Sequence, residues 1–181
     1  MGALERVHRL RDGTLFRLRP LGPADAEELR AGFARLSPAS RYRRFFTPIQ
    51  RLPESMLRRL TATDGWNHVA LVAETIPVYD EPPEPLGVGR FIRLANRPNV
   101  AEVALEVIDE KQGRGLGSVL LEALAELARA EGVTIFVATV LAENEPMHRL
   151  VRSFGPVVSV TRDGGTYEYE VRIGRRTSRA A

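Results

Sequence analysis

Cysteine is absent from this chain of 181 residues. Its absence excludes disulfides, zinc sites built on thiolates and thiol nucleophiles, and it is compatible with a reducing cytoplasm. Long apolar runs are absent too, since no stretch reaches the roughly 18 residues that a membrane-spanning helix needs. The first residues, MGALERVHRLRDG, carry charges throughout and lack the apolar core of a signal peptide. We therefore expect a cytoplasmic protein with no membrane partner.

Lysine is scarce: of the 26 basic residues only Lys111 is a lysine. A genome that favours arginine codons explains this bias. A second explanation is an enzyme that acts on lysines and avoids modifying itself, and the sequence does not separate the two.

The excess of positive charge is confined to the C-terminal end. Residues 171–181 hold four arginines and no acidic residue, and without them the chain has 22 basic against 23 acidic residues. The body of the protein is therefore close to neutral, and the arginine-rich end is expected to be a solvated tail. This distribution argues against a nucleic-acid partner.

Hydrophobic periodicity predicts an α/β fold with a mixed central sheet of six to seven strands flanked by helices. The expected strands are 14–20, 68–75, 86–95, 99–108, 133–141, 156–162 and 166–173. The expected helices are 22–36, 37–46, 53–62, 115–131 and 144–155. These elements form a single domain over 12–174, and 1–11 and 175–181 are expected to be flanking, mobile termini.

The stretch QGRGLGSVLLEAL (112–124) places three glycines in six residues directly before a strongly helical run. A glycine turn between a strand and a helix N-terminus offers free backbone N–H groups to an anion, and Arg114 adds a guanidinium that can pair with phosphate. The stretch lacks the Gly-Lys-Ser/Thr of the nucleotide-triphosphate loop and the G-x-G-x-x-G of dinucleotide folds. A plain turn at a helix start remains the alternative.

The same stretch resembles the Q/R-x-x-G-x-G/A motif of the GNAT superfamily of N-acetyltransferases, with Gln112, Gly115 and Gly117 at the motif positions. The resemblance runs from about Thr14 to about Ile173. The segments SRYRRFF, NHVALVA, AEVA and LAENEPMHRL are most similar to the catalytic domain of Pat-type bacterial protein lysine acetyltransferases. It implies that the loop holds the pyrophosphate of acetyl-CoA. The residues so implied are Gln112, Gly113, Arg114, Gly115, Leu116, Gly117 and Ser118.

The strand segment AEVALEVI holds two glutamates, Glu102 and Glu106, which share one face with Ala104 and Ile108. Lining a solvated sheet face would account for both. The family resemblance implies instead that Glu102 is the general base and that the backbone N–H of Glu106 polarises the acetyl carbonyl. It further implies that Val107 and Ile108 pair with the pantetheine arm.

Asn144 matches a family asparagine that lies near the CoA arm, and it also suits the N-cap of the helix that follows. Many relatives carry a tyrosine seven residues later as general acid, where this chain has Val151. His148 and His68 are acid–base residues in principle, but His148 lies among arginines and is expected to be exposed. No group of residues has metal-ligand spacing, so no metal is expected.

The resemblance implies an acetyl-CoA-dependent N-acetyltransferase, with acetyl-CoA as cosubstrate and a protein lysine as acceptor. A small-molecule amine or a protein N-terminus is the alternative acceptor. A non-catalytic acyl-CoA-binding module is the alternative from another class, and Glu102 argues against it because binding alone needs no base. A monomer or a homodimer is expected.

Overall fold

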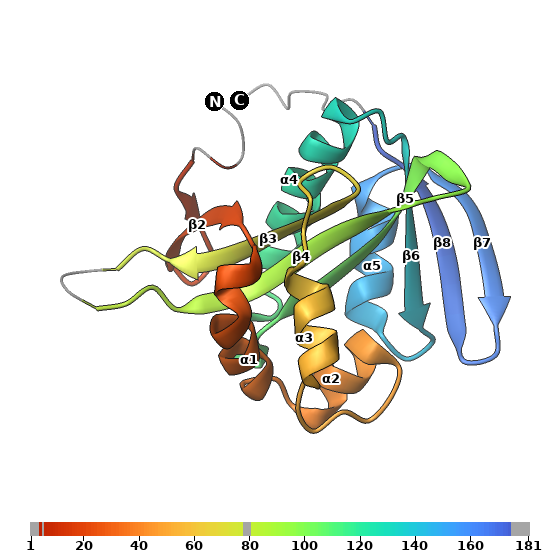
Figure 1. Cartoon of the computed structure of the whole chain (residues 1–181). Helices are drawn as coiled ribbons and strands as arrows, with labels where there is room; N and C mark the ends of the chain where they lie inside the picture. The colour runs from red at the N-terminus through yellow and green to blue at the C-terminus, as the bar shows by residue number, and fades with distance from the viewer. Residues whose placement is uncertain (1–3, 5, 78–80, 175–181) are drawn as a thin grey trace.

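The computed structural model describes residue 4, residues 6–77 and residues 81–174. They form one mixed sheet in the order β1-β2-β3-β4-β5-β6-β8-β7, with helices on both faces (Figure 1). The strands are β1 (His8–Arg9), β2 (Leu15–Pro20), β3 (His68–Thr75), β4 (Pro85–Leu94), β5 (Arg97–Val107), β6 (Ile135–Leu141), β7 (Val157–Asp163) and β8 (Thr166–Arg172). The α-helices are α1 (Ala26–Ala34), α2 (Pro38–Phe45), α3 (Glu54–Thr61), α4 (Leu116–Ala130) and α5 (Glu145–Phe154). The α/β expectation is confirmed, and the eighth strand is the short β1.

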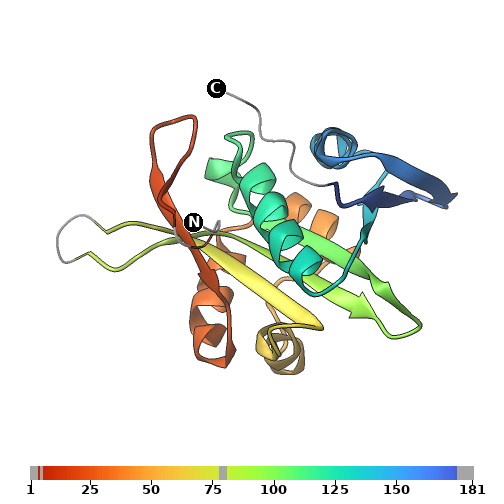
Figure 2. The ribbon, with the colours of Figure 1, turned by 90° about the horizontal axis from the view of Figure 1, so that it is seen from above.

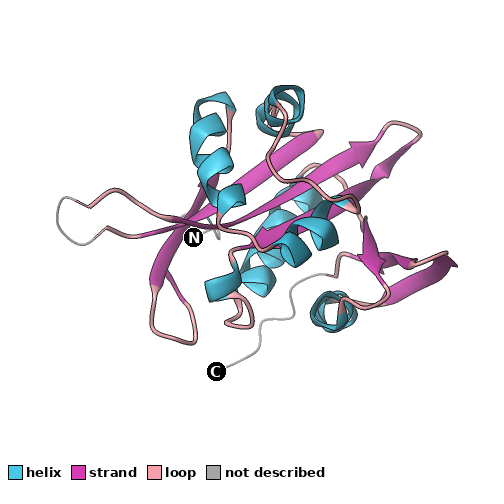
Figure 3. Cartoon of the chain, turned by 90° about the horizontal axis from the view of Figure 1, so that it is seen from below, coloured by secondary structure: helices cyan, strands magenta, loops and turns pink. Residues whose placement is uncertain are grey.

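The sheet separates two hydrophobic cores. The larger core lies between the sheet and α4, and its fully buried aromatic residues include Phe16, Phe91 and Tyr169. The smaller core lies under α1 and α3, and it contains Leu29 and Leu57. Figures 2 and 3 show these helices on opposite sides of the strands. Because β3 is covered on both faces, its six middle residues are all buried, and five of them, Val69 to Ala73, form a continuous apolar run.

The folded part begins earlier than residue 12. β1 pairs with β2, and Leu10 is buried in the larger core. Gly13 has φ +89° in the turn that joins the two strands, a conformation that favours glycine. The proposed tail 175–181 lies outside the described residues. Within the described ranges, no helix is long and apolar enough to cross a membrane.

β5 is the strand that positions the cleft described below. It is antiparallel to β4 along most of its length, but it pairs with the parallel strand β6 only at Val100, Ala101 and Glu102. Beyond Glu102 the two strands separate, while β6 stays paired with β8 up to Leu141. The second half of β5 therefore has one edge without a partner strand.

A buried carboxylate holds β2 to β3. Glu74 is 3 % exposed, and its two oxygens accept hydrogen bonds from the Nε atoms of Arg17 and Arg19, each at 2.8 Å. Arg19 also contacts Asp25 and Glu28, so the ion-pair group links the sheet to the start of α1. A buried carboxylate is stable only when it is paired in this way.

We predict that Glu74→Ala lowers the free energy of unfolding by about 3 kcal/mol, because two arginines lose a buried partner. The matched control is Glu28→Ala, which removes an exposed partner of Arg19 and should cost less than about 1 kcal/mol. Urea unfolding of both variants measures the difference. Equal losses in the two variants would show that Glu74 contributes no more than an exposed ion pair.

Candidate functional site

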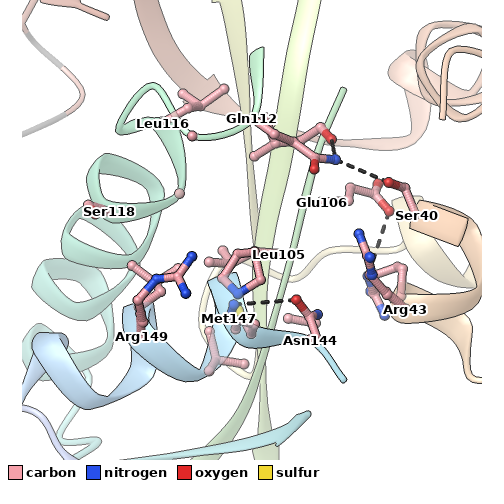
Figure 4. A pocket seen from close by; sticks show the side chains of 18 of the residues that line it. Ser40, Arg43, Leu105, Glu106, Gln112, Leu116, Ser118, Asn144, Met147 and Arg149 are labelled. Carbon is pink, nitrogen blue, oxygen red and sulfur yellow. Dashed lines mark hydrogen bonds and ion pairs between the residues drawn. The ribbon is translucent and has the colours of Figure 1, made fainter. Parts of the chain in front are cut away.

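A cleft of about 530 Å³ opens where β5 and β6 separate. The start of α4 and the length of α5 form one side, and α2 forms the other (Figure 4). The second half of β5 forms the floor. Of the residues expected at the site, Glu102, Glu106, Val107, Gln112, Gly113, Gly115, Leu116, Gly117, Ser118 and Asn144 line this cleft. The structure thus brings together most of the residues that the sequence singles out.

The register of β5 decides which backbone groups face the opening. Ile108 donates its N–H to Leu86 O on the β4 side, and Asn99 accepts from Thr134 on the β6 side. Since backbone groups of successive strand residues point to alternate edges, the even-numbered residues of this stretch face β4. The N–H and C=O of Leu105 and Val107 therefore face the unpaired edge.

This register does not agree with the expectation for Glu106. Its N–H points toward Val88 of β4 and away from the opening. Ile108 is not available either, because its N–H bonds Leu86 and its C=O accepts from Lys111. Val107 does present its backbone to the opening, as expected. Periodicity in the sequence shows which residues share a face, but it does not show which strand edge their N–H groups take.

The glycine loop holds a backbone conformation that other residues adopt poorly. Gly113 has φ +71° and Gly115 has φ +97°, and α4 begins at Leu116. The N–H groups at the start of α4 have no intrahelical acceptors, so they are free for an anion. Gly117 lies against α5: a Cβ built there would be 3.2 Å from Leu150. The loop is therefore shaped for a ligand at the helix start.

Gln112 fixes the loop to its surroundings. Its Nε2 donates to Val107 O at 3.0 Å, to Asp109 Oδ1 at 3.1 Å and to Ser40 Oγ at 3.1 Å. One amide thus joins the end of β5, the glycine loop and α2, as Figure 4 shows in part. This role explains a glutamine at the first position of the motif.

Arg114 does not line the cleft. Its Nη1 lies 3.4 Å from Asp12 Oδ2, and Lys111 Nζ lies 3.0 Å from the same oxygen. The Thr14 N–H and the Lys111 ammonium hold the pKa of Asp12 well below its usual range, so this carboxylate stays charged. The turn before β2 therefore stabilises the glycine loop through these ion pairs. The guanidinium of Arg114 contacts Asp12, where the sequence predicted a contact with phosphate.

Two other arginines line the cleft instead, Arg11 from the turn before β2 and Arg149 from α5. Neither forms an ion pair with another described residue. Sequence reasoning missed both. The sequence did contain a signal for Arg149. Asn144, Met147 and Leu150 are three residues apart, so they share one face of the helix, and this face lines the cleft. Arg149 lies next to this face.

The two glutamates of β5 have different surroundings. Glu106 is half-buried, and its Oε2 lies 3.6 Å from Arg44 Nε. Arg90 of β4 is a second cation near it; burial lowers the pKa of Arg90 to about 10 and the Glu106 charge opposes this shift. Glu102 is exposed in the cleft and makes no hydrogen bond or ion pair with any described residue. Glu106 is thus charge-compensated, and Glu102 is the carboxylate that remains free to accept a proton.

Asn144 is the N-cap of α5 and lines the cleft. Its Oδ1 accepts from Met147 N at 3.3 Å, which makes it the N-cap of α5. It also lines the cleft beside β5 (Figure 4). Because Asn144 caps α5 and also lines the cleft, the N-terminus of α5 lies at the cleft.

The expectation that His148 is exposed is wrong. His148 is 4 % exposed, with Nδ1 2.8 Å from Tyr169 Oη and Nε2 3.1 Å from Leu141 O. Since a carbonyl only accepts, Nε2 carries the proton and Nδ1 accepts from the tyrosine hydroxyl. His148 therefore anchors α5 to β6 and β8 behind the cleft. The arginines around His148 in the helix predict exposure. The side chain is buried instead because it packs against Tyr169 of β8, which is distant in the sequence.

His68 is also outside the cleft. Its Nδ1 lies 3.1 Å from Ala62 O, and its Nε2 lies 3.3 Å from Arg90 Nη1. Burial and the neighbouring Arg90 charge lower the pKa of His68, so the ring is neutral and accepts from the arginine. Neither histidine is placed to exchange a proton with a molecule in the cleft.

The split sheet, the glycine loop at a helix start and the free carboxylate define a group-transfer site for a phosphate-bearing donor. Residues 32–155 match the family described as Acetyltransferase (GNAT) family. The chain therefore belongs to the GNAT family of acetyltransferases, whose members are acyltransferases that use acetyl-CoA.

Individual proteins support this membership. The chain is 33% identical over 168 residues to Acetyltransferase Pat of Mycolicibacterium smegmatis, covering 91% of this chain and 48% of that protein, so it spans about half the length of this relative. It is similar to the crystal structure of the GNAT domain of S. lividans PAT, with 33% identity, a TM-score of 0.82 and coverage of 92% and 96%. Salmonella typhimurium yncA, a putative acetyltransferase solved with its cofactor acetyl-CoA, has the same fold at 19% identity, with a TM-score of 0.69 and coverage of 92% and 98%.

The loop geometry gives a prediction for CoA binding. CoA at about 100 times its Kd should raise the Tm of the wild-type protein by about 5–10 °C, because it binds only the native state. Gly115→Ala should lose most of this shift, since φ +97° is unfavourable for alanine and the loop must change its conformation.

The matched control for this prediction is Gly132→Ala at the other end of α4. Gly132 has φ +78°, and a Cβ there would also meet nothing within 4 Å, so the conformational cost is similar. Both variants should have a lower Tm without ligand, but Gly132→Ala should keep the full CoA shift. A full shift in Gly115→Ala would place the CoA site elsewhere.

Proposed function

We propose that this chain transfers the acetyl group of acetyl-CoA to the side-chain amine of a protein lysine, with Glu102 as general base. The observation that carries this proposal is the contrast between the two glutamates of β5: Glu106 is paired with arginine, whereas Glu102 faces the cleft unpaired. A free carboxylate beside a donor site has no use in a module that only binds acyl-CoA.

Acetyl-CoA fits the cleft as follows. The backbone N–H groups at the start of α4 and the loop before it would hold the pyrophosphate, with Arg11 and Arg149 as the nearest uncommitted cations. The pantetheine arm would pair with the open edge of β5 at Val107, in the place where a further strand would lie. The N–H of Leu105 is then the strand donor that stabilises negative charge on the acetyl oxygen, in the role first expected of Glu106.

Transfer to an amine requires a neutral nucleophile. A free lysine amine has a pKa of about 10.4, so it is almost entirely protonated at neutral pH. Glu102 would accept this proton, directly or through one water, as the amine nitrogen attacks the thioester carbon. The nitrogen of the tetrahedral intermediate then releases its remaining excess proton to water, the carbon–sulfur bond breaks, and CoA leaves as a thiolate. The place of the family tyrosine is taken by Val151, which is buried, so no side chain of α5 supplies an acid there.

The choice of acceptor rests on similarity and on the charge of the floor. The similarity to Pat of M. smegmatis and to the GNAT domain of S. lividans PAT supports an acceptor of the same kind as theirs. The uncompensated carboxylate of Glu102 in the floor of the cleft attracts an alkylammonium group before it is deprotonated. A small amine or a protein N-terminus carries the same charge, and acceptor panels assayed by the release of free CoA thiol would distinguish the three.

We predict that Glu102→Gln retains CoA affinity and lowers the turnover number at neutral pH at least about tenfold, because general-base assistance is typically worth about 10²- to 10⁴-fold. In the variant the amine must lose its proton to solvent, so the rate should recover as the pH rises toward the amine pKa. The measurement is a pH–rate profile with one lysine peptide.

Glu106→Gln is the matched control on the same strand face. Its carboxylate is compensated by Arg44, so its loss should reduce the rate much less and leave the pH profile unchanged in shape. Wild-type turnover in Glu102→Gln at neutral pH would instead favour attack by the small population of neutral amine.

A further inference from the structure

The segment from Ser37 to Ala62 is a basic stretch within the otherwise near-neutral body of the chain, separate from the arginine-rich C-terminal end. It contains six arginines and one acidic residue, Glu54, whereas the whole chain has a net charge of only +3. This segment comprises α2, α3 and the loop between them. It therefore carries a net charge of +5, and the remainder of the protein is slightly acidic.

Three of the six arginines are committed to contacts within the protein. Arg41 donates to Gln50 O and Ala34 O, and Arg44 is paired with Glu106. Arg58 lies 3.9 Å from Glu54. These three hold the segment together or balance a neighbouring charge.

The other three arginines are Arg43, Arg51 and Arg59, here called the basic rim. All three are exposed, and none forms a hydrogen bond or ion pair with another described residue. Arg43 lines the cleft from α2, across the cleft from α4 and α5. It lies close to Ser40 and Glu106 (Figure 4). Arg43 is thus the member of the basic rim that lies at the cleft.

An aromatic residue lies beside Arg43. Phe46 lines the cleft, is 40 % exposed, and has φ +56°, the one non-glycine residue with positive φ in the described part of the chain. A bulky residue in this conformation is strained, and such strain is concentrated at functional positions. Its exposed ring offers an apolar surface for the four-carbon stem of a lysine side chain.

We propose that the basic rim binds acidic residues that flank the acceptor lysine, so that the preferred substrate is a lysine in an acidic protein segment. This proposal rests on the proposed function and adds the substrate class. The floor of the cleft carries an uncompensated negative charge at Glu102, and its rim is positive at Arg43. A positive lysine between acidic neighbours matches both signs at once, whereas a lysine between basic neighbours is repelled at the rim.

Nucleic acid is the other polyanion that a basic surface can attract. Its phosphates carry no amine for the reaction, and they would meet the uncompensated carboxylate of Glu102 at the cleft. We therefore assign the basic rim to an acidic protein segment, and nucleic acid becomes an outcome of the test.

The test uses three peptides with one lysine each, identical except that the residues on both sides of the lysine are aspartate, serine or arginine. The initial rate of acetylation by the full chain gives kcat/KM for each peptide. We expect the aspartate peptide to exceed the serine peptide at least about threefold, since one exposed ion pair changes an affinity by up to about fivefold. The arginine peptide should be the poorest, and 0.5 M NaCl should remove most of the differences.

The decisive variant is Arg43→Glu, which should reverse the order of the aspartate and arginine peptides. The ratio between peptides is the readout, because a general loss of folding or of CoA binding changes all three rates together. Arg162→Glu makes the same charge change on β7, outside the cleft, and should leave the wild-type order intact.

Three outcomes would overturn the proposal. Equal kcat/KM values for the three peptides at low salt would show that the basic rim does not select acidic flanks, while the lysine acceptor stands. Inert peptides together with an acetylated small amine would overturn both the rim and the protein lysine acceptor. Equal peptide rates that an RNA oligonucleotide lowers, with relief in Arg43→Glu, would assign the basic rim to nucleic acid.

Discussion

The separation of β5 from β6 after Glu102 is the constraint on which the rest of the site depends. A parallel pair that ends halfway leaves one strand edge whose N–H groups have no partner strand, and such groups need a hydrogen-bond acceptor. The helix start at Gly115 and the N-cap of α5 at Asn144 both lie at this opening. An extended ligand with amide groups can form hydrogen bonds with this strand edge, and a negatively charged group can bind at the N-terminus of α4. One donor molecule with both features therefore fits the opening.

The charges of neighbouring residues make the two glutamates of β5 different, although their side chains are chemically identical. Glu106 has Arg44 and Arg90 near it, whereas Glu102 faces solvent in the cleft. The two side chains lie on the same face of β5, four residues apart, so the strand alone does not distinguish them. The distinction comes from α2 and β4, which deliver their arginines to one end of the strand only. A proton acceptor needs to stay uncompensated, and the neighbouring elements leave Glu102 in that state.

The sequence was sufficient for the elements and for most of the cleft, because local signals determine them. The apolar run of β3 and the glycines before α4 are where periodicity and turn chemistry placed them. The sequence was insufficient where contacts between segments that are distant in the chain determine the position of a residue. The backbone edge taken by Glu106 depends on the register with β4, Arg114 is drawn to Asp12 about a hundred residues away, and His148 is buried by Tyr169 of β8. None of these contacts leaves a periodic trace in the sequence.

The buried group behind α5 bears on how the leaving group departs. His148 and Tyr169 bond each other, Arg152 donates to the tyrosine hydroxyl at 3.1 Å, and Val151 is buried beside them. These polar side chains thus hold the helix that carries Asn144 and Arg149, and they are not available to protonate a sulfur. A thiolate is a good leaving group because a thiol is far more acidic than an alcohol or an amine, so CoA can depart without an acid and be protonated by solvent afterwards. Helix α5 therefore contributes position and shape to the cleft, and in the proposed reaction the proton acceptor is Glu102 in the floor.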